Sequence, residues 1–247
     1  MIHRLTQFCL DRSQTQPLYI SFGRCYPGNL SLAFGELVKH SARWKDVQLF
    51  YLPQCGEFPV HLPVLESLVI GGYSSGTGGF PEKVYSPRLR SLQVTHDAVS
   101  LSRRFELKSV TKLVLRDTVH GSGVFPVLRE CPVLRTLELD GVSFDRLDQV
   151  QPGAVSDKLA KQFVLRSGKP PLEELRFGHI NFYDIQDLED ILEMYSETLR
   201  RLSLVMCSHY SKRWDDVLER MTLGTWAWVG QEWRFEYRRG FARGFGG

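Results

Sequence analysis

The sequence is poor in cysteine: it holds five among 247 residues, and no two of them form a CxxC pair. A disulfide framework or a zinc cage would need cysteines at short, paired spacing, so we expect neither. Free thiols are typical of a reducing compartment, and we therefore predict an intracellular protein of the cytoplasm or nucleus. The N-terminus lacks the apolar stretch of a secretory signal, and no apolar run approaches the ~18 residues that span a bilayer.

An excess of one charge is also missing. The 31 Lys and Arg residues stand against 28 Asp and Glu residues, which leaves a formal net charge of +3. So weak a basic bias gives no electrostatic reason to expect a nucleic acid or a membrane surface as the partner.

Residue patterns that carry chemistry are scarce as well. The seven histidines never pair as HxH, HxxxH or HExxH, and no serine lies in a GxSxG motif. The glycine-rich stretch 71–79 carries Thr77 where a phosphate-binding loop has lysine, so we interpret it as a loop. The adjacent His96 and Asp97 are interpreted as turn residues. We therefore predict no catalytic residue, no metal ligand and no cofactor, and we do not expect an enzyme.

What the sequence does contain is a repeat of the pattern L-x-x-L-x-L. From Trp44 onward, the first residues of successive copies lie 21 to 27 residues apart, with one spacing of 38, and the period of leucine-rich repeats is 20–29 residues. Two looser copies precede the six clear ones. The copies are, in chain order, Thr15-Leu18-Ile20, Trp44-Val47-Leu49, Leu65-Leu68-Ile70, Leu89-Leu92-Val94, Val110-Leu113-Leu115, Leu134-Leu137-Leu139, Leu172-Leu175-Phe177 and Leu199-Leu202-Leu204.

The spacing within each copy predicts a short strand with one buried face. The second and third apolar residues are two apart, so they point to the same side of a strand, while the first closes the turn that precedes it. A single short strand cannot bury its own apolar face, but stacked copies share one core. Helical stripes are expected at 31–40 and 187–195, and irregular loops at 71–86 and 117–126. We predict an α/β fold: an irregular leucine-rich-repeat solenoid with parallel strands on a concave face, and helices and loops on the convex face.

The prediction divides the chain into four parts. Residues 1–13 form an N-terminal helix, and 14–210 form the solenoid with an insertion at 145–171. Residues 211–238, rich in tryptophan, form a cap for the open end of the solenoid, because that end otherwise exposes core and strand edge. Residues 239–247 form a flexible tail of arginine and glycine.

Residues that alternate with the inward leucines are expected to face a partner on the concave surface. Their mixed charges suit a polar protein surface but specify no ligand. The candidate partner-binding residues are Gln93, Lys112, Arg116, Glu138, Asp140, Glu174, Arg176 and Arg201. The same face is expected to include Ser67, Val69, Thr95, Val114, Thr136 and Ser203.

Several phrases of the sequence add a resemblance. The segments 40–47, 86–94 and 128–139, with the opening 10–20, resemble fungal (basidiomycete) F-box proteins with degenerate leucine-rich repeats. In that family the F-box docks on the adaptor of a cullin-type ubiquitin ligase, and the repeats are expected to hold a substrate. The resemblance thus implies ubiquitin-ligase components as partners. A three-helix F-box does not fit before the first repeat-like strand, and residues 1–13 resemble the remnant of the F-box linker.

The expected function is therefore a non-catalytic protein–protein interaction scaffold, resembling the substrate-binding repeat region of an F-box receptor, with an unidentified protein partner. Two alternatives stay open. The basic tail could make the protein RNA-associated. A hydrolase could use a dispersed cysteine or serine site, whose residues are distant in the chain.

Overall fold

The computed structural model describes most of the chain up to His209, and within it one parallel sheet dominates. The described residues are 2–22, 30–50, 58–71, 81–95, 104–117, 124–142, 170–179, 181–182, 185–205 and 208–209. Their helices are α1 (Ile2–Ser13), α2 (Leu30–Lys39), the 3-10 helix η2 (Ser41–Arg43), α4 (Val124–Arg129) and α6 (Ile185–Met194). Their strands are β1 (Leu18–Phe22), β2 (Trp44–Leu49), β3 (Ser67–Ile70), β4 (Ser91–Thr95), β5 (Lys112–Arg116), β6 (Thr136–Asp140), β7 (Glu174–Gly178), β8 (Asn181–Phe182), β9 (Arg201–Val205) and β10 (Ser208–His209).

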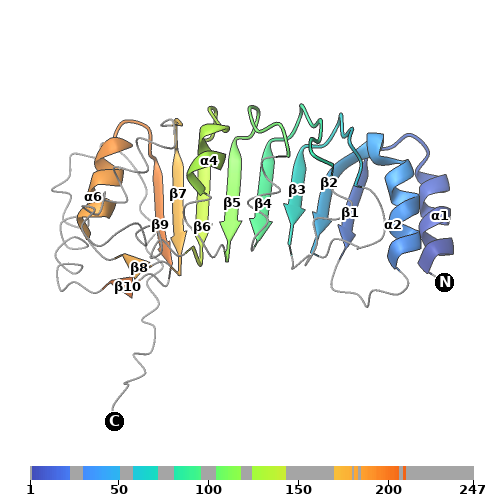
Figure 1. The fold of residues 1–247 in the computed structure, drawn as a ribbon, viewed down its shortest axis with the longest axis horizontal. Coiled ribbons are helices and arrows are strands. Elements are labelled where there is room, and N and C mark those ends of the chain that lie inside the picture. The colour runs from blue at the N-terminus through green and yellow to red at the C-terminus, as the bar shows by residue number, and fades with distance from the viewer. Residues whose placement is uncertain are drawn as a thin grey trace, which may run out of the picture.

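Eight of these strands form one open sheet in which every neighbouring pair is parallel. The strand order is β1-β2-β3-β4-β5-β6-β7-β9, so each strand lies beside the strand of this sheet that precedes it in the chain. The two short strands β8 and β10 pair separately. Helices α1 and α2 lie beyond β1 at one end of the sheet, and α6 lies beyond β9 at the other (Figure 1). The fold is thus α/β, as predicted.

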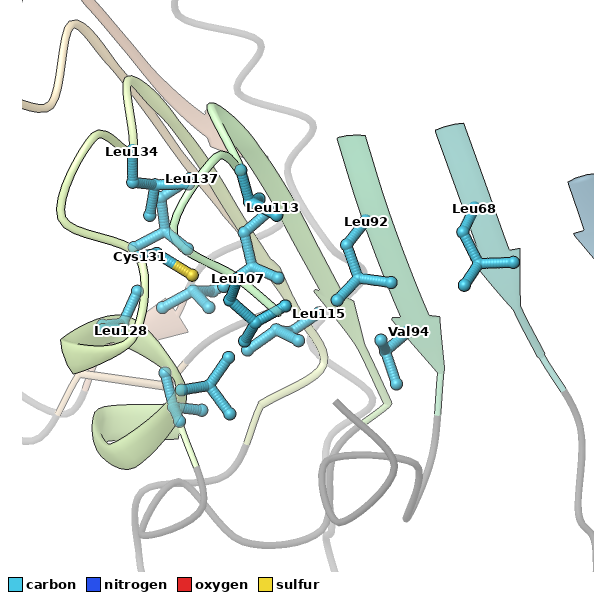
Figure 2. Packing of buried hydrophobic residues seen from close by; sticks show 14 of the residues in the cluster. Leu68, Leu92, Val94, Leu107, Leu113, Leu115, Leu128, Cys131, Leu134 and Leu137 are labelled. Atoms are coloured by element: carbon cyan, nitrogen blue, oxygen red, sulfur yellow. The ribbon is translucent and has the colours of Figure 1, made fainter. Parts of the chain in front are cut away.

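The predicted strands of the sheet are confirmed, and from β2 to β9 their register is confirmed as well. From Val47 onward, the middle apolar residue of each copy pairs with the middle residue of the next, and these residues are almost fully buried. Figure 2 shows part of this buried ladder, to which Val94 and Leu115 add a second row. The middle row consists of Val47, Leu68, Leu92, Leu113, Leu137, Leu175 and Leu202.

In the four copies from Leu65 to Leu134, the first apolar residue closes a tight turn, as its position predicts. The backbone N–H of Leu65 donates to the carbonyl of Leu62 at 3.2 Å, and that of Leu134 donates to Cys131 at 3.1 Å. The same four-residue turn, closed by a hydrogen bond between residues three apart, recurs at Leu89 and at Val110. These turns satisfy backbone groups next to the core, so these four copies enter the sheet in the same way. The copies of β7 and β9 differ: the N–H of Leu172 donates to Pro170, and that of Leu199 donates to Tyr195.

Helices pack on the apolar face of the sheet. Phe34 from α2, Leu128 from α4 and Ile191 from α6 belong to the same buried cluster as the ladder leucines. At the N-terminal end the cluster is aromatic: the rings of Phe34 and Trp44 lie 6.2 Å apart, and Trp44 is 6.2 Å from Phe58. One hydrophobic core therefore runs from β1 to β9.

Two details differ from the sequence prediction. In β1 the register is shifted by two residues: Ile20 pairs with Val47 and Phe22 with Leu49, because the pairing is irregular between Leu18 and Tyr19. A shift of two keeps the same side chains on the apolar face, so the core is preserved. The expected loop at 117–126 gives way to helix α4 from Val124, whose apolar residues at three- and four-residue spacing reach the core.

Several predicted features lie outside the described residues: nearly all of the insertion 145–171, the cap 211–238, the tail 239–247, and the pair His96 and Asp97. Among the helices that are described, none is long and apolar enough to cross a membrane.

Candidate protein-interaction surface

The side of the sheet opposite the apolar ladder carries polar side chains in rows, one residue per strand. We call this side the polar face. Its first row is Tyr19, Asp46, Ser67, Ser91, Lys112, Thr136, Glu174 and Arg201. Its second row is Ser21, Gln48, Val69, Gln93, Val114, Glu138, Arg176 and Ser203, and Thr95, Arg116, Asp140, Gly178 and Val205 form a third. All eight candidate residues of the sequence analysis lie on this face.

Charge is concentrated on one half of the polar face. On β1 to β4 the described rows carry a single charged side chain, Asp46, among serine, threonine and glutamine residues. On β5 to β9 the rows carry four cations and three carboxylates. We call this second half the charged half; its charged residues are Lys112, Arg116, Glu138, Asp140, Glu174, Arg176 and Arg201.

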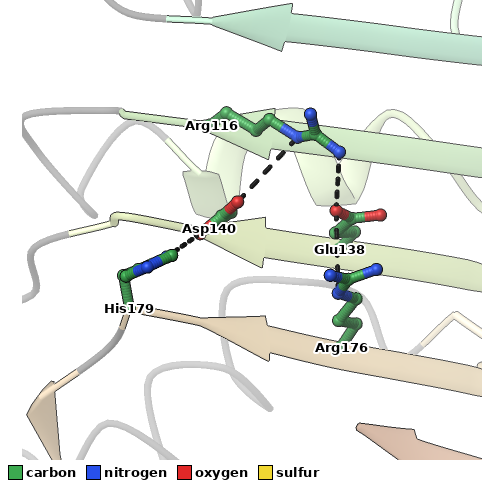
Figure 3. Close-up of polar contacts among 5 residues, drawn as sticks. All are labelled: Arg116, Glu138, Asp140, Arg176 and His179. Carbon is green, nitrogen blue, oxygen red and sulfur yellow. Dashed lines mark hydrogen bonds and ion pairs between the residues drawn. The ribbon is translucent and has the colours of Figure 1, made fainter. Parts of the chain in front are cut away.

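Glu138 is the centre of an ion-pair network in the charged half (Figure 3). Arg116 donates from Nη2 to Glu138 Oε1 at 2.9 Å, and Arg176 Nε lies 3.8 Å from the same oxygen. These residues stand on β5, β6 and β7, so two guanidinium groups flank one carboxylate. Its side chain is only 11% exposed, although its position alternates with the inward leucines. Burial of a carboxylate is tolerated here because the partners supply charge and hydrogen bonds.

Val114 is also buried on the polar face, as is Gly178 in the third row. Val114 lies between Gln93 and Glu138 in the second row and keeps 3% of its surface accessible. Long neighbouring side chains on both adjacent strands cover this short one. Alternation along a strand therefore does not make every residue of the polar face accessible.

His179 extends the network beyond the sequence-predicted residues. It follows β7 directly, and its Nδ1 lies 2.7 Å from Asp140 Oδ1, while Arg116 Nε lies 4.0 Å from Asp140 Oδ2 (Figure 3). The backbone of His179 has a φ of 51°, and Asp117 and Gly141, which follow β5 and β6, also have positive φ. All three residues stand four positions after a middle ladder leucine. That constant offset is the signal through which His179 could have been found.

An open depression of about 290 Å³ lies in the charged half. Arg201 donates from Nη1 to Glu174 Oε1 at 2.7 Å on its wall. The ammonium group of Lys112, which is exposed, has no ion-pair partner among the described residues. The depression is lined by Lys112, Thr136, Leu137, Glu138, Glu174, Leu175, Arg176, Arg201 and Ser203.

The described residues give this surface hydrogen-bonding and charged groups. Among them, no cluster of three or more His, Cys, Asp or Glu side chains could hold a metal ion. Burial raises the pKa of the Cys131 thiol to about 12, helped by the negative charge of Glu130, so this thiol stays protonated and unreactive at neutral pH.

Comparisons with models of protein families, with curated proteins and with solved structures found no match to this chain.

Proposed function

We propose that this protein is a non-catalytic interaction scaffold: an irregular leucine-rich-repeat solenoid whose polar face binds another protein. The resemblance to basidiomycete F-box proteins makes the substrate-binding repeats of a ubiquitin-ligase receptor the nearest functional analogy. The proposal assigns the chain neither a catalytic centre nor a cofactor.

The observation that carries the proposal is the one-sided burial of a parallel sheet. Parallel sheets in α/β proteins normally have helices on both faces, and their strands are then apolar throughout. Here β3, β4 and β9 alternate between buried and less buried residues; in β4 only Leu92 and Val94 are buried. Lys112, Arg176 and Arg201 are exposed on the second face. A parallel sheet with one accessible face is typical of solenoid proteins, which use that face for binding.

The solenoid assignment is supported by the repetition of one unit. Each copy between β3 and β6 consists of a four-residue turn and a strand in constant register, followed by a return segment that reaches the same core. Each strand pairs only with its sequence neighbours in the sheet. Such nearest-neighbour stacking defines repeat proteins and produces a long continuous surface.

The experiment compares capture by two immobilised variants that carry the same charge change. The face variant combines Lys112→Glu and Arg176→Glu, and the control combines Lys83→Glu and Lys108→Glu, two exposed lysines outside the polar face. Each variant is incubated with an extract of the source organism, and the retained proteins, including ligase adaptor subunits, are quantified by mass spectrometry. Thermal unfolding verifies that both variants fold.

We expect a set of proteins to be retained by the wild type and by the control but lost by the face variant. Identical protein lists for all three would refute a binding role of the polar face. A nuclease-treated extract distinguishes the RNA alternative, because partners bridged by RNA would then be lost from the wild type as well.

A further inference from the structure

We infer that the depression in the charged half binds carboxylate side chains of an acidic peptide segment in the partner protein. This inference rests on the proposed function and names the partner's chemistry. It is argued from hydrogen-bonding capacity, charge and accessibility in the lining of the depression.

The carboxylates of the lining are already occupied by the protein's own cations. Glu138 accepts a hydrogen bond from Arg116 and faces Arg176, and Glu174 accepts a hydrogen bond from Arg201. Both acceptors therefore have cationic partners within the sheet. A partner's lysine or arginine would have to displace these contacts in order to bind.

The cations of the lining keep donors to spare. An arginine has five N–H donors and a lysine three. Arg201 uses one donor on Glu174, and Arg176 lies at ion-pair distance from Glu138 without a hydrogen bond between them. Lys112 has no ion-pair partner among the described residues. The hydroxyl groups of Thr136 and Ser203 add further polar atoms. Most of the unused hydrogen-bonding groups of the lining are therefore donors. A complementary ligand would be negatively charged and rich in hydrogen-bond acceptors.

The charge count favours a carboxylate over a phosphate. The lining holds three cations, Lys112, Arg176 and Arg201, and two carboxylates, Glu138 and Glu174, so its formal sum is +1. A phosphoryl group carries about −1.5 to −2 charges at pH 7 and would face both carboxylates at close range. A carboxylate carries a single charge, so each acidic side chain of the segment meets less repulsion from Glu138 and Glu174 than a phosphoryl group would. Asp140 and His179 lie beside this lining and are paired with each other.

The geometry suits a segment that crosses several strands. Lys112 stands on β5, and Arg176 and Arg201 stand on β7 and β9. Neighbouring strands are about 4.8 Å apart, so the cationic positions on β5 and β7 are separated by about 10 Å at the backbone. An extended peptide covers this distance with about three residues. One acidic segment can therefore engage Lys112 and the two arginines at the same time.

The test measures binding of a fluorescently labelled octapeptide of alternating glutamate and glycine to the full chain. Two further arms use the same peptide with glutamine, or with phosphoserine, in place of glutamate. The protein variants are Lys112→Gln, Arg176→Gln and, as the matched control, Lys83→Gln. Exposed ion pairs contribute up to about fivefold in affinity each, and salt weakens them.

We expect the glutamate peptide to bind more tightly than the glutamine and phosphoserine peptides. Lys112→Gln and Arg176→Gln each weaken it up to about fivefold, Lys83→Gln leaves it unchanged, and Lys112→Arg restores the lost affinity. Preference for phosphoserine, equal loss in the Lys83 control, or no binding of the glutamate peptide would overturn the inference. If the acidic-peptide inference failed but retention of extract proteins still required Lys112 and Arg176, the proposed binding function would remain supported.

Discussion

Replacing Glu138 by glutamine probes how strongly the ion-pair network stabilises the sheet. The substitution keeps the shape of the side chain and removes its charge, so Arg116 and Arg176 lose the anion between them. Arg116 depends on this partner, because its Nε is buried without a hydrogen bond and lies 4.0 Å from Asp140. A hydrogen bond to a charged group contributes about 1.5–3 kcal/mol, and a fully exposed ion pair about 0.2–1 kcal/mol.

Glu138 lies between these limits, since its carboxylate is nearly buried while the Arg116 side chain is 40% exposed. We therefore expect Glu138→Gln to lower the free energy of unfolding by about 1–2 kcal/mol. For a chain of this size that corresponds to a decrease of the melting temperature by about 2–8 °C. The matched control is Glu174→Gln, which breaks the half-exposed pair with Arg201 and should cost less than about 1 kcal/mol.

Thermal and urea unfolding of both variants, and of Arg116→Gln alone and combined with Glu138→Gln, give the coupling energy of the pair. A coupling of about 1 kcal/mol is expected, and 0.5 M NaCl should reduce the effect at Glu174 more than that at Glu138. Equal costs for Glu138→Gln and Glu174→Gln, or additive effects at Arg116 and Glu138, would refute the assignment of a buried network.

Three further substitutions or reactions test the fold. Leu113→Ala removes a fully buried ladder side chain and should cost about 2–5 kcal/mol in urea unfolding; a cost below ~1 kcal/mol would contradict the ladder packing. Gly178→Ala would place a Cβ 2.5 Å from Asp140 Oδ1, so we expect a loss of about 1–3 kcal/mol; an unchanged unfolding midpoint would show that the Asp140 side chain does not lie there. Iodoacetamide should label the exposed Cys9 and spare the buried Cys131, whose raised pKa keeps it protonated, until denaturant is added. Because an unfolded cysteine ionises near pH 8.5, the stability contributed by the neutral Cys131 should be complete below that pH and decline toward pH 12.

The strands could be predicted from the sequence because the pattern L-x-x-L-x-L encodes both the turn and the buried face. Once Leu92 and Leu113 are assigned to equivalent positions, the parallel register follows, and with it the side on which Lys112 lies. The strand of the weakest copy, Thr15-Leu18-Ile20, is present as β1, but its register could not be predicted, because only the structure reveals the irregular pairing that places Ile20 opposite Val47. The alternation of side chains is a property of a single strand and can be predicted from its own sequence. An irregularity in pairing depends on the neighbouring strand as well.

Burial on the polar face could not be predicted in the same way. Alternation places Val114 and Glu138 on the accessible side, but both are buried. Their accessibility is decided by Gln93, Arg116 and Arg176, which come from adjacent strands and from other copies of the repeat. A pattern read along one strand contains no information on the length of the side chains beside it. The charged network therefore emerged only from the structure.

The burial of Glu138 also determines which variants can separate binding from folding. A charge held between two guanidinium groups contributes to stability, so changing Glu138 or Arg116 alters both the fold and the surface that a partner would meet. Lys112 is exposed and without an ion-pair partner among the described residues, so its replacement costs the isolated protein little. If Lys112→Gln weakens binding while its melting temperature stays within about 2 °C of the wild type, the lost interaction belongs to the complex. The same affinity loss in Glu138→Gln could not be attributed in that way, because destabilisation alone would produce it.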